Sequence, residues 1–246
     1  MTAQALLSLW NGVDPARAQE YERWHTLEHV PERVWVPGFV SGTRYSRTDA
    51  NGPQFFTLYE IDGLACLESD AYRDLVDRPT PWSASMRTAF NGFVRKTGPV
   101  LATAGTVAGR SIAVSRLVWA QGMMTPPEAV WSSYAADLLR AGADALVTRV
   151  RVQQAVPAGP AALRSTDSAP AGTEVLLIVE LAAEDAGAAV ALVAPALARA
   201  GIESPAWRED SSFRFVSHVR HADVASAVRP APRMDLFRPD SGLQPG

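Results

Sequence analysis

The chain has little of what marks a secreted, membrane-embedded or nucleic-acid-binding protein. Its single cysteine, Cys66, cannot form an internal disulfide bond. The N-terminus lacks the basic region and long apolar run of a secretion signal, and apolar runs such as 175–181 and 188–197 are shorter than the roughly 20 residues that span a bilayer. A net charge of −3 provides no positive field for a phosphate backbone. We expect a cytoplasmic protein that binds neither membrane nor nucleic acid.

At 246 residues, with 47% apolar and 20% charged side chains, the chain has the composition of a globular protein and the length of one large or two ordinary domains. Asp14-Pro15 suits the start of a helix, and Pro31 disfavours helical backbone at Val30, so we expect that helix to end near His29 with a brief helical turn after it. The elements expected in the first part are a strand at 4–10, a helix at 14–29, strands at 39–47 and 54–61 around a turn at 49–52, a helix at 64–76 and a strand at 90–100.

The same order of elements begins again near residue 110. The expected elements are a strand at 111–121, a helix at 126–140, strands at 145–155 and 173–181 around a Pro/Gly/Ser-rich loop, a helix at 183–200 and a strand at 211–220. We predict an α+β protein in which two tandem ferredoxin-like βαββαβ units, residues 1–107 and 108–226, pack the open faces of their antiparallel sheets together as one α/β barrel. The Pro-rich tail, 227–246, has little to bury and is expected to be an extended arm or disordered.

Residues 20–45 hold most of the reactive side chains. His25 and His29 are two of the four histidines and lie four positions apart, so on a helix they share one face with Tyr21. Histidine titrates near neutrality and can move a proton, and a helix end at His29 would favour its charged form. One hypothesis has the imidazoles project into a cavity inside the barrel, where one is a general acid/base and the other orients it or the substrate. The structural alternative has His29 hydrogen-bonded to the backbone and His25 half exposed.

Short motifs covering roughly residues 5–95 together match a family pattern. They are Asp14-Pro15, Trp24-His25, Glu28-His29-Val30-Pro31-Glu32-Arg33, Pro37-Gly38-Phe39, Arg44-Tyr45, Leu58-Tyr59-Glu60, Leu67-Glu68-Ser69, Ala71-Tyr72 and Pro79-Thr80-Pro81-Trp82. This part of the chain resembles EthD-like proteins of the dimeric α/β-barrel superfamily, whereas the second half shows only the fold pattern. The resemblance implies a barrel made here within one chain, and it aligns His29 with the histidine of the family's Glu-His-Val/Ile-Pro motif. The superfamily includes cofactor-free monooxygenases, muconolactone-type isomerases, polyketide cyclases and haem enzymes, so the resemblance supports the fold better than the reaction.

The segment from His25 to His29 also matches the H-x-x-E-H pattern, in which two imidazoles bind zinc and the Glu activates water. Such a site needs a third protein ligand, and near 64–76 only Glu68 and Asp70 stand out. A short pattern in a helix rich in Glu and His arises readily by chance, so we expect neither a metal nor another cofactor.

Several side chains near the histidines are candidates for substrate binding. Arg44 and Tyr45 are neighbours on a strand, so only one of them can enter the barrel, and Tyr59 and Glu60 pose the same alternative. The functional hypothesis places a tyrosine hydroxyl and Arg44 beside His29. The structural hypothesis instead pairs an arginine with a glutamate across two strands on the helix side of the sheet, while aromatic side chains fill the inside of the barrel. The aromatic residues expected to line or seal an apolar cavity are Trp24, Trp35, Phe39 and Trp82.

The second half departs from the first because its helix at 128–140 has no histidine. We expect this half to serve as a scaffold wall, and the missing imidazole disfavours a haem site of the kind whose axial ligand comes from the second unit. His218 and His221 lie at the end of the last strand, in a solvated position or at the barrel mouth. Cys66 lies in an apolar helix and is expected to be packed.

These observations favour a cofactor-independent enzyme of the isomerase or lyase type. Catalytic His29 and His25, with Tyr21, Trp24, Arg44, Tyr45, Tyr59 and Trp82 as substrate-binding residues, would act on a small, partly apolar carbonyl compound in a catabolic reaction. Cofactor-free oxygenation is a close variant. The alternatives are a non-catalytic barrel that binds a hydrophobic metabolite or only assembles, and pairing of two chains through their helices stays open.

Overall fold

The computed structural model describes residues 4–47, 54–123 and 126–238. The predicted turn at 49–52 lies outside the described residues. The strands are β1 (Ala5–Val13), β2 (Phe39–Ser46), β3 (Phe55–Ile61), β4 (Phe90–Gly105), β5 (Ser111–Trp119), β6 (Val147–Gln154), β7 (Thr173–Leu181) and β8 (Trp207–Arg220). The α-helices are α1 (Ala18–Trp24), α2 (Val30–Trp35), α3 (Asp70–Asp77), α4 (Pro81–Met86), α5 (Glu128–Ala141), α6 (Gly187–Arg199) and α7 (His221–Val224).

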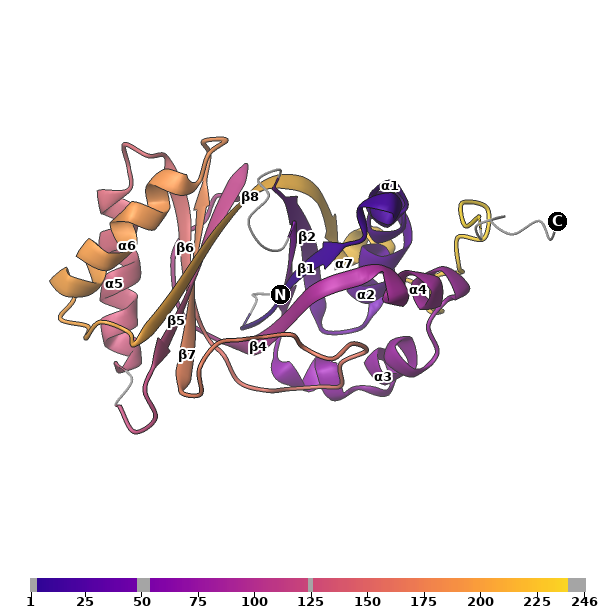
Figure 1. Cartoon of the computed structure of the whole chain (residues 1–246), viewed down its shortest axis with the longest axis horizontal. Helices are drawn as coiled ribbons and strands as arrows, with labels where there is room; N and C mark the ends of the chain where they lie inside the picture. Colours follow the sequence, from indigo (N-terminus) through magenta and orange to yellow (C-terminus); the bar gives the residue numbers. More distant parts are fainter. Residues whose placement is uncertain (1–3, 48–53, 124–125, 239–246) are drawn as a thin grey trace.

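The strands form one closed antiparallel barrel in the order β1-β3-β2-β8-β5-β7-β6-β4. Each half contributes four neighbouring strands in the same relative order, β4-β1-β3-β2 and β8-β5-β7-β6, and the halves are joined by the pairs β2–β8 and β4–β6. Helices α1 to α4 cover the first half and α5 and α6 cover the second, at opposite ends of the molecule (Figure 1). The expected α+β fold with a closed antiparallel barrel is confirmed.

The interior of the barrel is filled. Side chains alternate across a strand, so in β1 Leu6 and Trp10 face inward while Leu7 and Leu9 face the helices. The inward-facing residues from both halves form one apolar cluster: Leu6, Trp10, Tyr45, Phe56, Leu58, Val94, Ile112, Val114, Leu176, Ile178 and Phe213. The barrel is therefore a packed core rather than a container.

Ion networks flank this cluster within the barrel. One network pairs Arg151 with Glu60 and Glu180, with distances of 2.5 and 2.6 Å. The other pairs Arg116 with Glu174 and Asp167, each at 2.8 Å. Because charges of both signs meet in each network, the desolvation of each arginine is offset by its carboxylates.

The first helix continues past its predicted end. Residues His25–His29 form a π-helical turn between α1 and α2, in which the amide of Val30 donates to the carbonyl of His25. Pro31 cannot donate a hydrogen bond, and its ring crowds the carbonyl four residues earlier. A π turn directly before it is a common way to accommodate such an interruption, so the helix runs on to Trp35.

Close packing then holds α2 against the sheet. A Cβ atom on Gly42 in β2 would lie 2.8–2.9 Å from side-chain carbons of Val34, Tyr59 and Val30. Only a residue without a side chain allows this approach. The backbone of α2 is thereby held close to β2 and β3, with the histidine-bearing turn directly before it.

Two further segments differ from expectation. The predicted helix at 64–76 is a 3₁₀ turn (Leu64–Glu68) followed by α3, because the Ser69 hydroxyl caps α3 by accepting from the amide of Tyr72. The short helix α4, capped by Thr80, was not predicted. No helix in the described ranges is long and apolar enough to cross a membrane.

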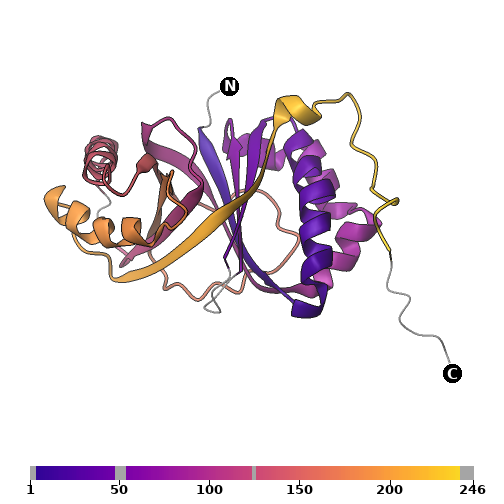
Figure 2. The same cartoon turned by 90° about the horizontal axis from the view of Figure 1, so that it is seen from above.

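The C-terminal segment is an extended arm as far as residue 238. It follows α7 and runs along the helices of the first half (Figure 2). Arg229 pairs with Glu32 at 2.7 Å and Asp74 at 2.9 Å, and Phe237 stacks on Trp82 with ring centroids 6.0 Å apart. The arm therefore buries more than its composition indicated.

Replacing Phe56 with Ala should lower the free energy of unfolding by about 3–5 kcal/mol, because the ring is fully buried between the two halves and its removal leaves a cavity. Phe215→Ala is the matched control: that ring is 45% exposed, and its loss should cost less than about 1 kcal/mol. Urea unfolding of both variants checks this, and equal losses would contradict a packed barrel interior.

Candidate functional site

The predicted histidine stripe exists as a stack of rings. Tyr21 and His25 stack with centroids 4.8 Å apart, and His25 and His29 stack at 5.2 Å. Trp24 closes one side, with its ring centroid 4.4 Å from that of His29. The π turn thus places both imidazoles on the side of the helix that faces the sheet.

The rings of Trp24, His25 and His29 line a cavity of about 80 Å³ that lies between the helices and the outer face of the first-half sheet. The expectation that the imidazoles project into the interior of the barrel is therefore wrong, because inward-facing apolar side chains fill that space. The cavity is lined by Leu7, Leu9, Asn11, Trp24, His25, His29, Arg33, Thr57, Tyr59, Tyr72, Val76, Ser83, Arg87, Phe90, Phe93, Arg95, Ala161, Ala162 and Leu163.

Four predicted site residues line this cavity: His25, His29, Trp24 and Tyr59. His25 is only 3% exposed, and no hydrogen bond from either imidazole to a described residue is found. The structural alternative, with a half-exposed His25 and a backbone bond at His29, does not describe this arrangement. Trp24 is held in place because its indole N–H donates to the hydroxyl of Ser83 at 3.1 Å.

The other predicted binding residues lie behind the cavity or elsewhere. Tyr21 donates to Asn11 Oδ1 at 3.1 Å beneath the histidine stack. Arg44 faces the helices and pairs with Glu22 at 2.7 Å, so its partner is a helix residue and not the predicted cross-strand glutamate. Tyr45 points into the barrel core, and Trp82 lies under the C-terminal arm and donates to Glu20 Oε1 at 2.9 Å.

The two aromatic residues expected to share the cavity with Trp24 also lie outside its lining. Phe39 packs in the core between α2 and the sheet, where its ring lies 5.5 Å from that of Tyr59. The indole of Trp35 donates to the backbone carbonyl of Ser226 at the start of the C-terminal arm.

Burial keeps both imidazoles neutral. Desolvation, followed by the charges of Arg44 and His29, holds the pKa of His25 well below its usual value. Desolvation and then Arg33 and Arg87 do the same to the pKa of His29. The expectation that a helix end favours charged His29 is wrong, because the helix continues and burial dominates. A neutral imidazole can accept a proton, so the pair is suited to the role of a base.

Polar groups without partners converge on the cavity. The Nδ1 atoms of His25 and His29 and the hydroxyl of Tyr59 are buried and have no hydrogen-bond partner among the described residues. Burial raises the pKa of Tyr59 well above that of a free phenol, so the hydroxyl stays protonated and can donate. Buried polar groups are normally satisfied, so this concentration makes the cavity the candidate ligand site.

Three arginines that were not predicted as site residues also line the cavity: Arg33, Arg87 and Arg95. Arg33 lies four residues after His29 and so continues the spacing of Tyr21, His25 and His29. The expected end of the helix near Pro31 hid this signal. Arg95 could not have been found in this way, since its place follows from the pairing of β4 with β1.

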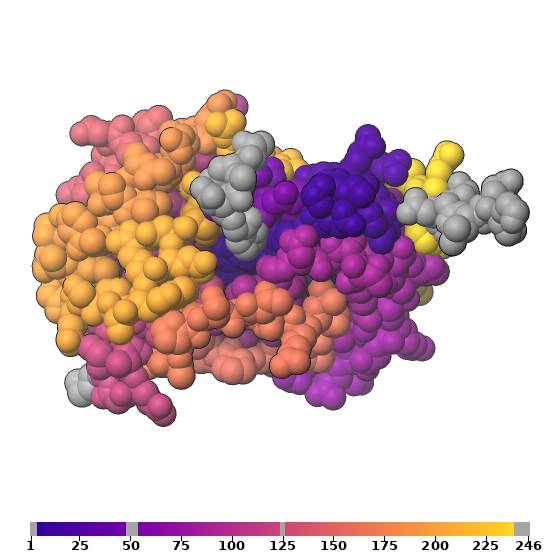
Figure 3. Space-filling view, viewed as in Figure 1, coloured from indigo at the N-terminus to yellow at the C-terminus, as the bar shows by residue number. Residues whose placement is uncertain are grey.

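One wall of the cavity comes from the second half. We call residues 155–172, between β6 and β7, the strap. Its residues 161–163 line the cavity, and the backbone amides of Gly159 and Thr166 donate to Glu68 Oε1 at 2.7 Å and to the carbonyl of Phe93 at 2.8 Å. Gly159 has φ +67°, and a Cβ there would lie 2.6 Å from that of Leu67, so the strap approaches closely. It crosses between the halves on the face shown in Figure 3.

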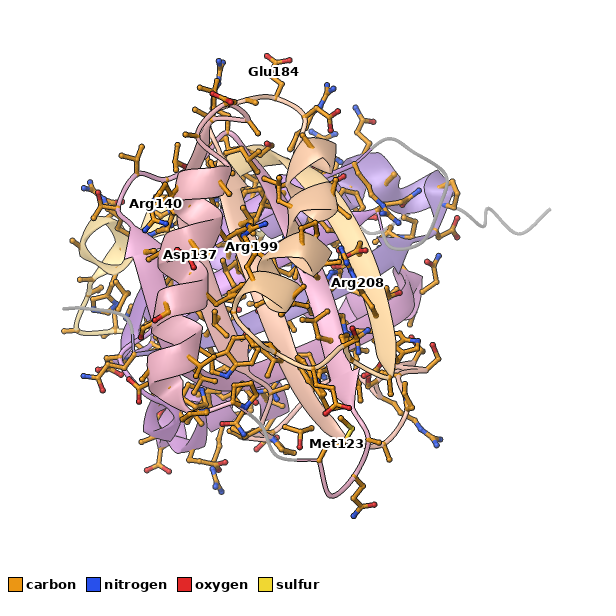
Figure 4. The ribbon with its side chains drawn as sticks, turned by 90° about the vertical axis from the view of Figure 1, so that its left-hand side faces the viewer. Met123, Asp137, Arg140, Glu184, Arg199 and Arg208 are labelled. Atoms are coloured by element: carbon orange, nitrogen blue, oxygen red, sulfur yellow. The ribbon has the colours of Figure 1, made fainter. Side chains whose placement is uncertain are left out.

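In the second half, side chains fill the space between the helices and the outer face of the sheet. Trp131 and Tyr134 of α5 and Trp119 of β5 are buried between helix and sheet, with the rings of Trp119 and Trp131 6.0 Å apart. Figure 4 shows α5 and α6 lying over this sheet. Neither helix carries a histidine, and the space is occupied by indole rings, so these residues do not fit a haem with an axial imidazole from this half.

The zinc pattern does not assemble either. Glu28 accepts from the hydroxyl of Thr80 at 2.6 Å and from the amide of Arg233 at 2.7 Å. Within the described ranges no group of three His, Cys, Asp or Glu side chains has the geometry of a metal site.

The remaining candidates lie away from the cavity. His218 is exposed at the barrel end and bonds Thr43 at 2.8 Å. His221 contacts the carbonyl of Val34. Cys66 is buried, and burial raises the pKa of its thiol to about 12, which makes it a poor nucleophile.

Comparison with known proteins shows the fold. No family model and no curated protein matches the chain. An anthrone oxidase-like protein matches with a TM-score of 0.58 and 12% identity, covering 93% of this chain and 97% of its own. A proposed monooxygenase from Lactobacillus acidophilus NCFM matches with a TM-score of 0.53 and 9% identity, covering 89% of this chain and 97% of its own. A mutant chlorite dismutase from Candidatus Nitrospira defluvii matches with a TM-score of 0.51 and 8% identity, covering 88% of this chain and 93% of its own. The chain therefore has the fold of the dimeric α/β-barrel proteins, and the likeness extends to the fold alone.

The two depressed histidine pKa values predict a pH dependence of stability. A histidine whose pKa is lowered on folding binds fewer protons in the native state, so stability is fully present above the unfolded value of about 6.5 and is lost as the pH falls below it. The slope should approach about 1.4 kcal/mol per pH unit for each histidine. Urea unfolding between about pH 7.5 and 5 measures it.

The double variant His25→Gln/His29→Gln should lose this part of the slope, whereas His221→Gln, which leaves both buried rings in place, should keep it. An unchanged slope in the double variant would show that the imidazoles are not held neutral by the fold.

Proposed function

We propose that the chain is a cofactor-independent enzyme that moves a proton on a small, partly apolar carbonyl compound, of the isomerase or lyase type. The observation that carries the proposal is the pair of buried imidazoles, unpartnered at Nδ1 among the described residues, that line one largely apolar cavity. Burial keeps both rings unprotonated at neutral pH, so each is free to accept a proton, and the apolar surroundings strengthen each polar interaction with the substrate.

Each lining group has a role in this reaction. His29 removes a proton from the carbon next to the carbonyl, and the Tyr59 hydroxyl donates to the oxygen on which negative charge develops. His25 stacks between Tyr21 and His29, which fixes the plane of the second ring. Asn11, Thr57 and Ser83 add neutral polar groups, while Trp24 and Phe90 supply the apolar wall. Return of the proton to another atom gives isomerisation, and loss of a leaving group gives elimination.

The EthD-like assignment belongs to this proposal. It rests on the motif that contains His29 and on the barrel fold, and a tandem origin of the two halves would explain why one half carries the cavity and the other a filled core. Under this reading the chain needs no second copy to complete its barrel.

Cofactor-free oxygenation is a second candidate. The same proton removal leaves a carbanion, which can transfer electrons to dioxygen when the substrate is sufficiently electron-rich. Two structural neighbours carry the names anthrone oxidase-like and monooxygenase, which supports this chemistry by fold alone. Oxygen consumption that depends on the substrate separates it from isomerisation or elimination.

The proton-transfer step can be tested before the natural substrate is known. In deuterated buffer, the protein should accelerate the exchange of the methylene protons of phenylacetone or phenylpyruvate, followed as loss of the proton NMR signal. His29→Ala should lower the accelerated rate by about 10²-fold or more with nearly unchanged melting temperature, because a positioned base contributes about this much.

His218→Gln, on an exposed strand end, serves as the control and should keep the full rate. Exchange that is not accelerated for either compound, or that survives His29→Ala, would contradict the proposal. Loss of folding in His29→Ala would instead assign the ring a structural role.

A further inference from the structure

We propose that the ligand of this cavity carries a carboxylate, which Arg33 and Arg95 hold, and that an apolar body occupies the rest of the space. The inference rests on the proposed function in placing the ligand beside the histidines, but it follows from a separate observation. The described residues that line the cavity include three arginines and no aspartate or glutamate.

Arg33 is the strongest element of this argument. The Arg33 side chain, on α2, is buried, at 8% exposure, and no carboxylate among the described residues lies within 4.0 Å of its guanidinium. Its Nη1 atom is buried without a hydrogen-bond partner there, and its one ring contact is with Tyr72, whose centroid lies 5.4 Å from Cζ. A buried cation without an anion is costly, so a charged partner is expected to arrive with the ligand.

Other arginines of the described chain show how unusual a buried guanidinium without a carboxylate contact is. Arg116 and Arg151, similarly buried at 4% each, are both paired with two or more carboxylates. Arg229, in the C-terminal arm beside α2, forms ion pairs with two carboxylates, those of Glu32 and Asp74. Of the buried arginines among the described residues, Arg44, Arg116 and Arg151 each contact a carboxylate, whereas Arg33 does not.

Arg95 provides the second donor. It lies on β4, whereas Arg33 lies on α2, and its buried Nη2 atom also has no hydrogen-bond partner among the described residues. Two guanidinium groups from opposite layers of the cavity match a planar anion with two oxygens, since each guanidinium offers a fixed fork of N–H donors. Arg87 adds positive charge, although its Nη2 already donates to the carbonyl of Val76.

One of these arginines also contributes to the depressed pKa of the imidazoles. Arg33 lowers the pKa of both His25 and His29 in addition to the effect of burial. A carboxylate held between the arginines would offset that effect, raising the histidine pKa values towards neutrality as the ligand enters. Ligand binding and the strength of the base are therefore coupled through one set of side chains.

The apolar lining indicates the polarity of the rest of the ligand, to which the carboxylate is attached. Leu7, Leu9, Phe90, Phe93 and Leu163 leave no polar partner for a second charge on their side of the cavity. A monocarboxylate with an aromatic or short aliphatic body fits this division better than inorganic phosphate or a dicarboxylate. The volume of about 80 Å³ is below the range of about 300–1,000 Å³ of typical ligand pockets, so the ligand is small or displaces the strap.

Size-matched charged and neutral probes test the inference. Isothermal titration calorimetry and thermal shift would compare propionate with propionamide and benzoate with benzamide at fixed ionic strength. We expect at least tenfold tighter binding of one carboxylate than of its amide. Equal binding, or no binding by either carboxylate, would overturn the inference.

The variants locate the effect. Arg33→Gln and Arg95→Gln should each weaken carboxylate binding at least tenfold while leaving amide binding unchanged. Arg140→Gln is the matched control, because Arg140 is exposed on α5 in the second half, where it pairs with Asp137 at 2.6 Å (Figure 4). It should change binding less than twofold, and an equal loss in this control would overturn the assignment.

The unliganded variant gives an independent readout. Replacing an unpaired buried cation removes a desolvation cost, so the melting temperature of Arg33→Gln should be equal to or above that of the original protein. A melting temperature several degrees lower would assign Arg33 a structural role and overturn the inference.

Failure of this inference is distinct from failure of the proposed function. His29→Ala should keep the preference for carboxylates, because a neutral ring contributes little to it. Proton exchange that depends on His29 without any carboxylate preference removes only the anion inference. A carboxylate preference with exchange independent of His29 removes only the proposed reaction.

Discussion

The constraint on which the structure depends is the filling of the closed barrel. Once β2 pairs with β8 and β4 with β6, the inward-facing side chains of the strands share one interior, whose centre is filled by the apolar cluster. The stacked histidines of the first half lie instead on the outer face of the sheet, beneath its helices. The position of the cavity between helix and sheet is therefore a consequence of how the core of the whole chain is packed.

Much of this arrangement could be predicted from local patterns. The order of strands and helices in both halves follows from apolar periodicity and turn residues, and the histidine stripe follows from a spacing of four. Pro31 misled the prediction, because Val30 directly before it keeps helical backbone, with φ −67° and ψ −45°, and the preceding π turn lets the helix continue. The faces of Arg44 and Tyr45 could not be decided, since alternation says only that they differ and not which one meets the core.

The arginines illustrate a different limit. Arg33 could have been selected by extending the stripe one more step, but its lack of a carboxylate partner is a property of the fold. Whether a buried cation is paired depends on strands and loops distant in sequence, as Arg116 shows with Asp167 and Glu174. Spacing along one helix can thus identify which groups meet, whereas their charge balance is decided by every element packed around them.

The strap gives the second half a part in acid–base chemistry for which it has no reactive groups at the cavity. The histidines are neutral because they are dry, and residues 161–163 help to exclude water from them. A separated first half would retain every reactive side chain and yet expose them to solvent, where imidazoles regain their ordinary proton affinity and guanidinium charges are screened. Under the proposed function, proton transfer at the cavity of one half therefore depends on a loop of the other, so changes of length or sequence in that loop offer a route to new reactivity without altering any group that touches the reacting atoms.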